Sequence, residues 1–300
     1  MSSYPPNSDQ DLLWTPSNPA QTQTSLFREH IKQKYSISLI TYEDLYNWSI
    51  DHRADFWSSL WDWENVIGFK GNHMVDEKAS PEDNPKWFEA SRLDWAENQL
   101  RHSVSNPDDI AVIQTSESTS SYTPPTKRIT QSELNKLVGK TQRSLIKAGV
   151  RKGDRIAFWG GNVLEAVVLV LATSSLGGIF SSAASDFGVD GVKERLEQIK
   201  PKLLFVTNGV IYNGVIRPLL PLLPKLLDSL QDPPEKVVII YHLPEDLVGI
   251  PKELNVKDIW DNWLDDKEET TKFEQLDFND PIWILFSSGT TGKPKAIVVS

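Results

Sequence analysis

The sequence contains no cysteine, and basic residues are fewer than acidic ones, 31 against 41. Without cysteine there can be no disulfide framework, no thiolate metal site and no cysteine nucleophile, which fits a reducing compartment such as the cytoplasm. The formal net charge of −10 argues against nucleic acid or an anionic membrane surface as a main partner. It does not argue against a nucleotide, because a locally basic loop can bind an anion within an acidic protein.

Long hydrophobic runs are also missing. The most apolar helical run, residues 163–171, is too short to span a bilayer and contains Glu165. Residues 1–24 are rich in Ser, Pro, Asn and Gln and lack the basic region and apolar stretch of a secretory signal. We therefore expect no membrane span, a cytoplasmic location, and a mobile tail and lead-in over residues 1–40.

The next part of the chain predicts helices. Over residues 41–60, Thr41 and Asp44 form a capping-box pattern and apolar residues recur at helical spacing. His52 lies on that apolar stripe, so we interpret it as a packed core or boundary residue. A second helix is expected over residues 91–103, with Ser91 as its cap. The turn at residues 106–108 then indicates a boundary between a segment 41–105 and a domain 106–300.

From residue 110 onward, strands alternate with helices, which predicts an α/β fold with a largely parallel sheet flanked by helices. The expected strands are 110–114, 127–129, 154–159, 179–182, 202–207, 237–241 and 282–286. The expected helices are 130–149, 162–176, 189–200, 216–230 and 256–264. The prolines at positions 218, 221 and 224 leave the start of the 216–230 helix open.

The last stretch is a strand, a loop and a strand. The loop between the apolar runs 282–286 and 296–299 consists of Ser287, Ser288, Gly289, Thr290, Thr291, Gly292, Lys293, Pro294 and Lys295. The two glycines let backbone N–H groups point at an anion, while the hydroxyls add donors and the lysines add charge. This composition favours a polyphosphate ligand. The alternatives are a polar hairpin loop without a ligand and, for Lys295 alone, a structural charge at the start of the last strand.

The better-known Walker A phosphate motif does not fit this loop. A Walker A sequence has four residues between its glycines and Ser or Thr after its lysine. Here two residues separate Gly289 from Gly292, and Pro294 follows Lys293. The spacing therefore argues against a P-loop phosphotransferase.

The loop closely resembles the Ser-Gly-Thr-Thr-Gly-x-Pro-Lys motif of the adenylate-forming superfamily, which includes the acyl-CoA synthetases. The resemblance implies an enzyme that activates an acid with ATP and Mg²⁺ and transfers it to coenzyme A. It implies phosphate binding by Ser288, Gly289, Thr290, Thr291, Gly292 and Lys293, with Ser287 and Lys295 flanking.

Three further stretches are similar to one branch of that superfamily, the acetoacetyl-CoA synthetases. They are the Tyr-x-x-Leu-x-x-Trp-Ser pattern within 41–60, Trp87-Phe88 with the 93–100 segment, and the 185–192 segment with its Asp-Phe-Gly sequence. The resemblance implies an N-terminal segment over 41–105 and acetoacetate as the acid substrate. The sequence departs from the branch at Ser185 and Gly161, where that branch has proline. Open alternatives are a ligase for acetate or another short acid and a non-catalytic nucleotide- or pyrophosphate-binding module.

The family's adenine-binding strand, ribose-binding acid and catalytic lysine come after the phosphate loop. We therefore expect the catalytic residues downstream of Ser300 and assign no catalytic residue and no metal ligand within these 300 residues. Residues 106–300 are interpreted as the first part of an AMP-binding domain, which we expect to be inactive alone.

Overall fold

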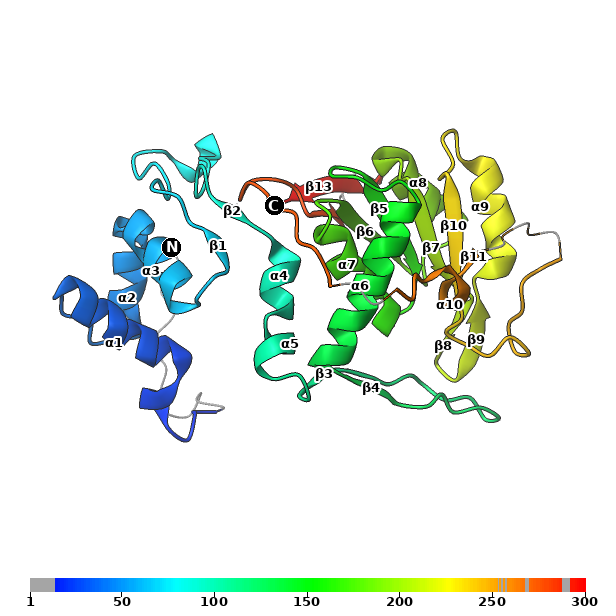
Figure 1. The fold of residues 1–300 in the computed structure, drawn as a ribbon, viewed down its shortest axis with the longest axis horizontal. Helices are drawn as coiled ribbons and strands as arrows, with labels where there is room; N and C mark the ends of the chain where they lie inside the picture. The colour runs from blue at the N-terminus through cyan, green and yellow to red at the C-terminus, as the bar shows by residue number, and fades with distance from the viewer. Residues whose placement is uncertain (1–13, 253, 255, 257, 268–269, 288–291) are drawn as a thin grey trace. The chain divides into compact units, whose positions relative to one another are not determined.

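The computed structural model describes residues 14–252, 254, 256, 258–267, 270–287 and 292–300. The chain forms two compact units (Figure 1): Met1–Val66 with Gly71–Glu89, and Ile67–Lys70 with Ala90–Ser300. Residues 90–105, which the sequence pattern grouped with the N-terminal segment, pack with the second unit. The boundary of the adenylation domain itself stays a prediction.

The described part of the first unit is helical. Its elements are the 3-10 helices η2 (Pro19–Gln21) and η3 (Pro81–Asp83) and the α-helices α1 (Gln23–Tyr35), α2 (Tyr42–Asp51) and α3 (Arg53–Trp63). Phe27 and Ile31 of α1 pack with Leu39, Leu45 and Trp48 in a small core. Helix α1 lies in the stretch that we expected to be a tail and lead-in, and the bounds 1–40 of that stretch stay a prediction.

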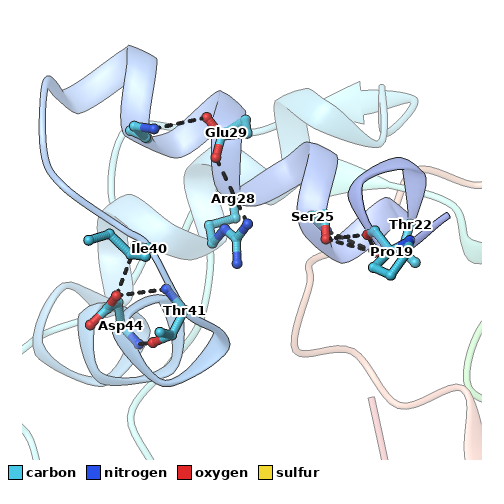
Figure 2. A network of polar contacts seen from close by, with 9 residues as sticks. Pro19, Thr22, Ser25, Arg28, Glu29, Ile40, Thr41 and Asp44 are labelled. Carbon is cyan, nitrogen blue, oxygen red and sulfur yellow. Dashed lines mark hydrogen bonds and ion pairs between the residues drawn. The ribbon is translucent and has the colours of Figure 1, made fainter. Parts of the chain in front are cut away.

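The capping box predicted at Thr41 is confirmed (Figure 2). Asp44 Oδ2 accepts hydrogen bonds from the backbone N–H groups of Thr41 and Ile40, each at 2.8 Å, and Thr41 Oγ1 accepts one from Asp44 N at 3.1 Å. These hydrogen bonds to the carboxylate lower the pKa of Asp44. The same figure shows the cap of α1, where Thr22 Oγ1 accepts from Ser25 N at 3.3 Å.

The single helix predicted over 41–60 is two helices. His52 separates α2 from α3 with non-helical backbone angles, φ −127° and ψ 55°. Its side chain is exposed and stacks on Trp48 with ring centroids 5.5 Å apart. The interpretation of His52 as a packed residue is therefore wrong, because the helix break turns it out of the apolar stripe.

The second unit holds the sheet. Its strands are β1 (Gly68–Phe69), β2 (Arg92–Leu93), β3 (Ile110–Gln114), β4 (Lys127–Thr130), β5 (Arg155–Gly160), β6 (Ile179–Ala184), β7 (Leu203–Thr207), β8 (Gly209–Tyr212), β9 (Val215–Pro218), β10 (Lys236–Ile240), β11 (Asp258–Ile259), β12 (Trp283–Ser287) and β13 (Lys295–Val299). Its helices are α4 (Trp95–Leu100), α5 (His102–Ser105), α6 (Gln131–Lys147), α7 (Leu164–Ser174), α8 (Val189–Ile199), η4 (Leu220–Leu222), α9 (Leu223–Ser229) and α10 (Trp260–Trp263).

Among the described residues, seven strands form the main sheet in the order β11-β10-β7-β5-β6-β12-β13. All neighbours are parallel except β12 and β13, which are antiparallel. Side chains alternate between two cores: Ile156 and Phe158 pack with α6 and α7 on one face, and Ala157 and Trp159 pack with α8 and α9 on the other (Figure 1). The predicted α/β class with a largely parallel sheet is confirmed.

Three predicted helices of this unit are wrong in detail. The helix expected over 91–103 begins at Trp95, and its cap is Asp94, whose carboxylate accepts from Glu97 N at 3.0 Å. Ser91 is buried before β2 and caps nothing. A second short helix, α5, follows α4.

The helix expected over 216–230 begins only at Leu223, because residues 215–218 form the second strand of a hairpin with β8. The turn between β8 and β9 is Asn213-Gly214, and both residues have a positive φ, 52° and 71° respectively. Asn-Gly between two apolar pairs is a strong hairpin signal that the helical interpretation overlooked. Likewise, β11 and the short α10 occupy the described part of the expected 256–264 helix.

Within the described ranges, every helix is too short or too polar to cross a membrane.

Candidate functional site

The candidate phosphate loop joins β12 to β13. The two strands pair from Trp283 with Val299 to Ser287 with Lys295, so Ser287 and Lys295 face each other at the loop's base. Gly292 and Lys293 are also described, whereas Ser288, Gly289, Thr290 and Thr291 lie outside the described residues. The structure thus brings the two flanking residues of the predicted site together.

The described residues of this loop suit an anion. Gly292 has a φ of 107°, in the region that glycine adopts readily and other residues rarely do. Lys293 and Lys295 are exposed, and neither ammonium forms a salt bridge with any residue that the structure describes. Their positive charges are therefore available to a ligand.

The topology places the loop at the edge of the sheet where the parallel strands have their carboxyl ends. Because β12 runs parallel to β6, its carboxyl end lies at the same edge as the carboxyl ends of β5, β6, β7 and β10. The connections after β5 and β6 leave toward opposite faces, through α7 and α8 respectively. In open α/β sheets this reversal opens a crevice outside the strand ends, where ligands bind.

A cavity of about 670 Å³ lies at that edge. Its walls are the segments that follow β3, β5, β6 and β10, together with the β8–β9 hairpin and the chain after it. The lining residues are Thr115, Ser116, Glu117, Gly161, Asn162, Ser185, Asp186, Phe187, Gly188, Val210, Ile211, Tyr212, Arg217, Pro218, Leu219, Leu222 and His242. No described residue of the phosphate loop is among them. Volume and position suit a small organic substrate or part of a larger one.

His242 is the titratable group of this cavity with a changed pKa. Burial lowers the pKa of His242, and the nearby Lys127 lowers it further, while Glu165 acts in the opposite direction. The imidazole is therefore neutral near pH 7, and its Nε2 lies 3.4 Å from Ser116 Oγ. At this wall it can accept or donate a hydrogen bond without adding charge.

A buried asparagine holds His242 in place. Asn208, fully buried after β7, donates through Nδ2 to the carbonyls of Leu243 and Val248, at 2.8 and 2.9 Å. Its Oδ1 accepts from the N–H groups of His242 and Leu243, each at 3.0 Å. Sequence reasoning missed Asn208 and the cavity. The available signals were a polar residue directly after an apolar strand and the Asn213-Gly214 turn.

In the described ranges, no group of three or more His, Asp or Glu side chains could hold a metal ion. Mg²⁺ bound to a nucleotide commonly keeps several waters and takes its other ligands from one or two carboxylates and the phosphates.

A family model described as "AMP-binding enzyme" matches residues 74–300, most of the chain. The chain belongs to this family. The match includes the sheet, the cavity and the β12–β13 loop, and it confirms the family resemblance of that loop.

Individual proteins of known name are similar to this chain. The chain is 35% identical to an acetoacetyl-CoA synthetase of Xenopus tropicalis over 96% of its own length and 43% of that protein's. It is 36% identical to a malonamoyl-CoA synthetase, vrtB, of Penicillium aethiopicum over 98% of its length and 41% of that protein's. A solved acetoacetyl-CoA synthetase from Streptomyces lividans matches with a TM-score of 0.82 and 28% identity, over 93% of this chain and 41% of that one. The chain thus spans less than half the length of these relatives.

Proposed function

We propose that this AMP-binding chain carries out the nucleotide-binding part of an acetoacetate–CoA ligase reaction. The observation that carries the proposal is the β12–β13 loop, with two uncommitted lysines, at the carboxyl edge of a parallel sheet beside a substrate-sized cavity. The relatives named acetoacetyl-CoA synthetases support acetoacetate as the acid substrate. The cysteine-free sequence supports a cytoplasmic location for this activity.

The proposed reaction has two steps. A carboxylate oxygen of the acid attacks the α-phosphorus of ATP, and the bond from that phosphorus to the oxygen bridging to the β-phosphate breaks, which releases pyrophosphate. The thiolate of coenzyme A then attacks the acyl carbon of the acyl-adenylate, and AMP leaves with the electron pair of the broken C–O bond. The first step depends mainly on positioning and charge neutralisation.

In this proposal the loop holds the β- and γ-phosphates. Lys293 supplies charge, Gly292 supplies a backbone turn that a side chain would strain, and Ser287 and Lys295 close the base of the loop. Mg²⁺ bound to the same phosphates would neutralise further charge. The described residues add no carboxylate cluster to that ion.

Replacing Lys293 with Ala tests the phosphate assignment. Losing one preorganised contact to a charged transition state costs roughly a hundredfold or more in rate, so ATP–pyrophosphate exchange by the full-length protein should fall by that factor. Lys225→Ala is the matched control, because Lys225 is an exposed lysine of α9 outside the cavity lining. Wild-type exchange by the Lys293→Ala variant would refute the assignment.

A second acid is supported by the malonamoyl-CoA synthetase relative, which is as similar as the acetoacetyl-CoA synthetases. Malonamate and acetoacetate both carry a carbonyl two bonds from the carboxylate and differ by an amide nitrogen in place of a methyl group. A site that hydrogen-bonds the amide would favour malonamate strongly, whereas an apolar site would favour acetoacetate.

Comparing kcat/KM for acetoacetate, malonamate, acetate and butyrate on the full-length protein identifies the preferred acid substrate. We expect acetoacetate to be the best substrate and both 3-carbonyl acids to exceed acetate and butyrate. A preference for acetate would contradict the proposed acid and leave the family assignment intact.

A further inference from the structure

The strand that leads into the phosphate loop is weakly attached to the sheet at its carboxyl end. β12 pairs with β6 at Trp283 and Phe180, and Phe180 N donates to Ile282 O at 2.9 Å. One residue pair further on, the Ser181 hydroxyl donates to Ile284 O at 2.8 Å. Past Ile284, β12 has no ladder pair with β6 among the described residues, whereas β5 and β6 pair from Arg155 with Ile179 to Gly160 with Ala184.

Helix α8 contacts β12 where this pairing ends. The guanidinium carbon of Arg195 lies 4.0 Å from the ring centroid of Phe187 and 5.4 Å from that of Phe286. Arg195 Nη1 also donates to Gly191 O, one turn earlier in the helix, at 2.7 Å. The guanidinium is therefore held against a residue of the cavity wall and the residue before Ser287.

A second side chain of α8 contacts the other flank of the loop. Gln198 Nε2 donates to Pro294 O at 3.0 Å and to Glu194 O of its own helix at 2.9 Å. Pro294 is buried and directly precedes Lys295. Arg195 and Gln198 thus contact the residues that precede the two ends of the loop, Ser287 and Lys295.

We infer that Arg195 and Gln198 are positioning residues for the polyphosphate loop, and that Arg195 couples the loop to the Phe187 wall of the cavity. The inference rests on the proposed function for its ligand. Neither side chain needs to touch the nucleotide. They hold the loop's flanks in one conformation, so that less conformational entropy is lost when the phosphates bind.

The chemistry of Arg195 makes this inference testable. A planar guanidinium stacks on aromatic rings, which a lysine ammonium does not reproduce, although both carry one positive charge. The core packing of α8 comes from other residues, Val192, Leu196 and Ile199. Arg195→Lys should therefore preserve the fold and the charge. It removes the stacking of the guanidinium against the rings of Phe187 and Phe286.

The experiment compares Arg195→Lys and Gln198→Ala with Lys193→Met, a control on α8 whose ammonium pairs with Glu197 instead of the loop. In full-length protein, pyrophosphate affinity by calorimetry should fall about tenfold for Arg195→Lys, less for Gln198→Ala, and not for the control. Amide hydrogen exchange of the ligand-free protein should accelerate around Phe286 and Lys295 in the first two variants and stay unchanged in β5 and β7.

The outcomes separate this inference from the proposed function. If Arg195→Lys shows wild-type affinity and wild-type exchange at Phe286, the positioning role is refuted, even where Lys293→Ala abolishes binding. If the wild-type protein does not bind pyrophosphate, the proposed function fails. The exchange measurement still decides whether α8 orders the flanks of the loop.

Discussion

The centre of the sheet and its β12–β13 end differ in what holds them. All five residues of β7 are buried, and Trp159 and Phe205 are among the largest fully buried side chains. At the other end, Leu285, Ile297 and Val298 are exposed to 50, 48 and 63%. The centre therefore gains stability from the burial of apolar side chains on both faces, an effect that does not depend on precise bond geometry. Among the described residues, the loop-bearing hairpin buries Ile284 and otherwise depends more on directional contacts with β6 and α8.

This difference is typical of a binding loop carried by a rigid scaffold. Segments with few buried apolar contacts open locally at a lower free energy than core strands do. Side chains such as Ser181, Arg195 and Gln198 then decide how firmly the residues on either side of the loop are held before a ligand binds.

A matched pair of leucine truncations should show the largest effect. Leu204 of β7 is fully buried, so Leu204→Ala should lower the free energy of unfolding by about 2–5 kcal/mol. Leu285→Ala, on the half-exposed β12, should cost less than about 1 kcal/mol. Urea unfolding followed by tryptophan fluorescence measures both variants. Equal losses would mean that the hairpin is as well packed as the centre.

The support beneath β12 should depend on pH through Asp94. This residue caps α4, whose Trp95 packs edge-on against Trp283 of β12, with ring centroids 5.1 Å apart. The pKa of Asp94 is raised to about 7, mainly by burial and to a smaller extent by the charges of Glu97 and Glu274, while hydrogen bonds from backbone N–H groups oppose the shift.

Because the folded pKa exceeds the unfolded one, Asp94 favours folding below about pH 4, and this stability is lost as the pH rises through about 7. Asp94→Asn keeps a capping side chain and removes the titration. The variant should be more stable than the wild type at pH 8, by on the order of 3 kcal/mol, and close to it at pH 4. Thermal unfolding of both proteins from pH 4 to pH 8 measures this, and parallel pH profiles would contradict it.

Ser181→Ala should lower global stability less than Leu204→Ala does. It leaves Ile284 O without its 2.8 Å hydrogen bond, at a cost of about 1–2 kcal/mol. Ser182→Ala, at the exposed neighbouring position, should leave stability unchanged. Amide exchange should accelerate in β12 for Ser181→Ala alone. Identical exchange in the two variants would show that this hydrogen bond does not hold the hairpin.

The sequence alone determined the α/β class and the alternation of strands and helices, because both follow from local periodicity. The capping box at Thr41 and the glycine-rich loop were readable for the same reason, since each depends on residues within a few positions. The hairpin of residues 209–218 was equally local. Its Asn-Gly turn lies within the sequence pattern that the helical interpretation of residues 216–230 overlooked.

Tertiary structure decided what depends on distant partners. The charge of Glu274 contributes to the raised pKa of Asp94, and the hydrogen bonds of Asn208 extend to the carbonyl of Val248. The contact between Gln198 and Pro294 joins residues 96 positions apart. No local pattern encodes these contacts, because they exist only once the order of strands in the sheet has placed β6, β12 and α8 together. The sequence therefore determined which loop carries the charge, and the packing of α8 determined how that loop is held.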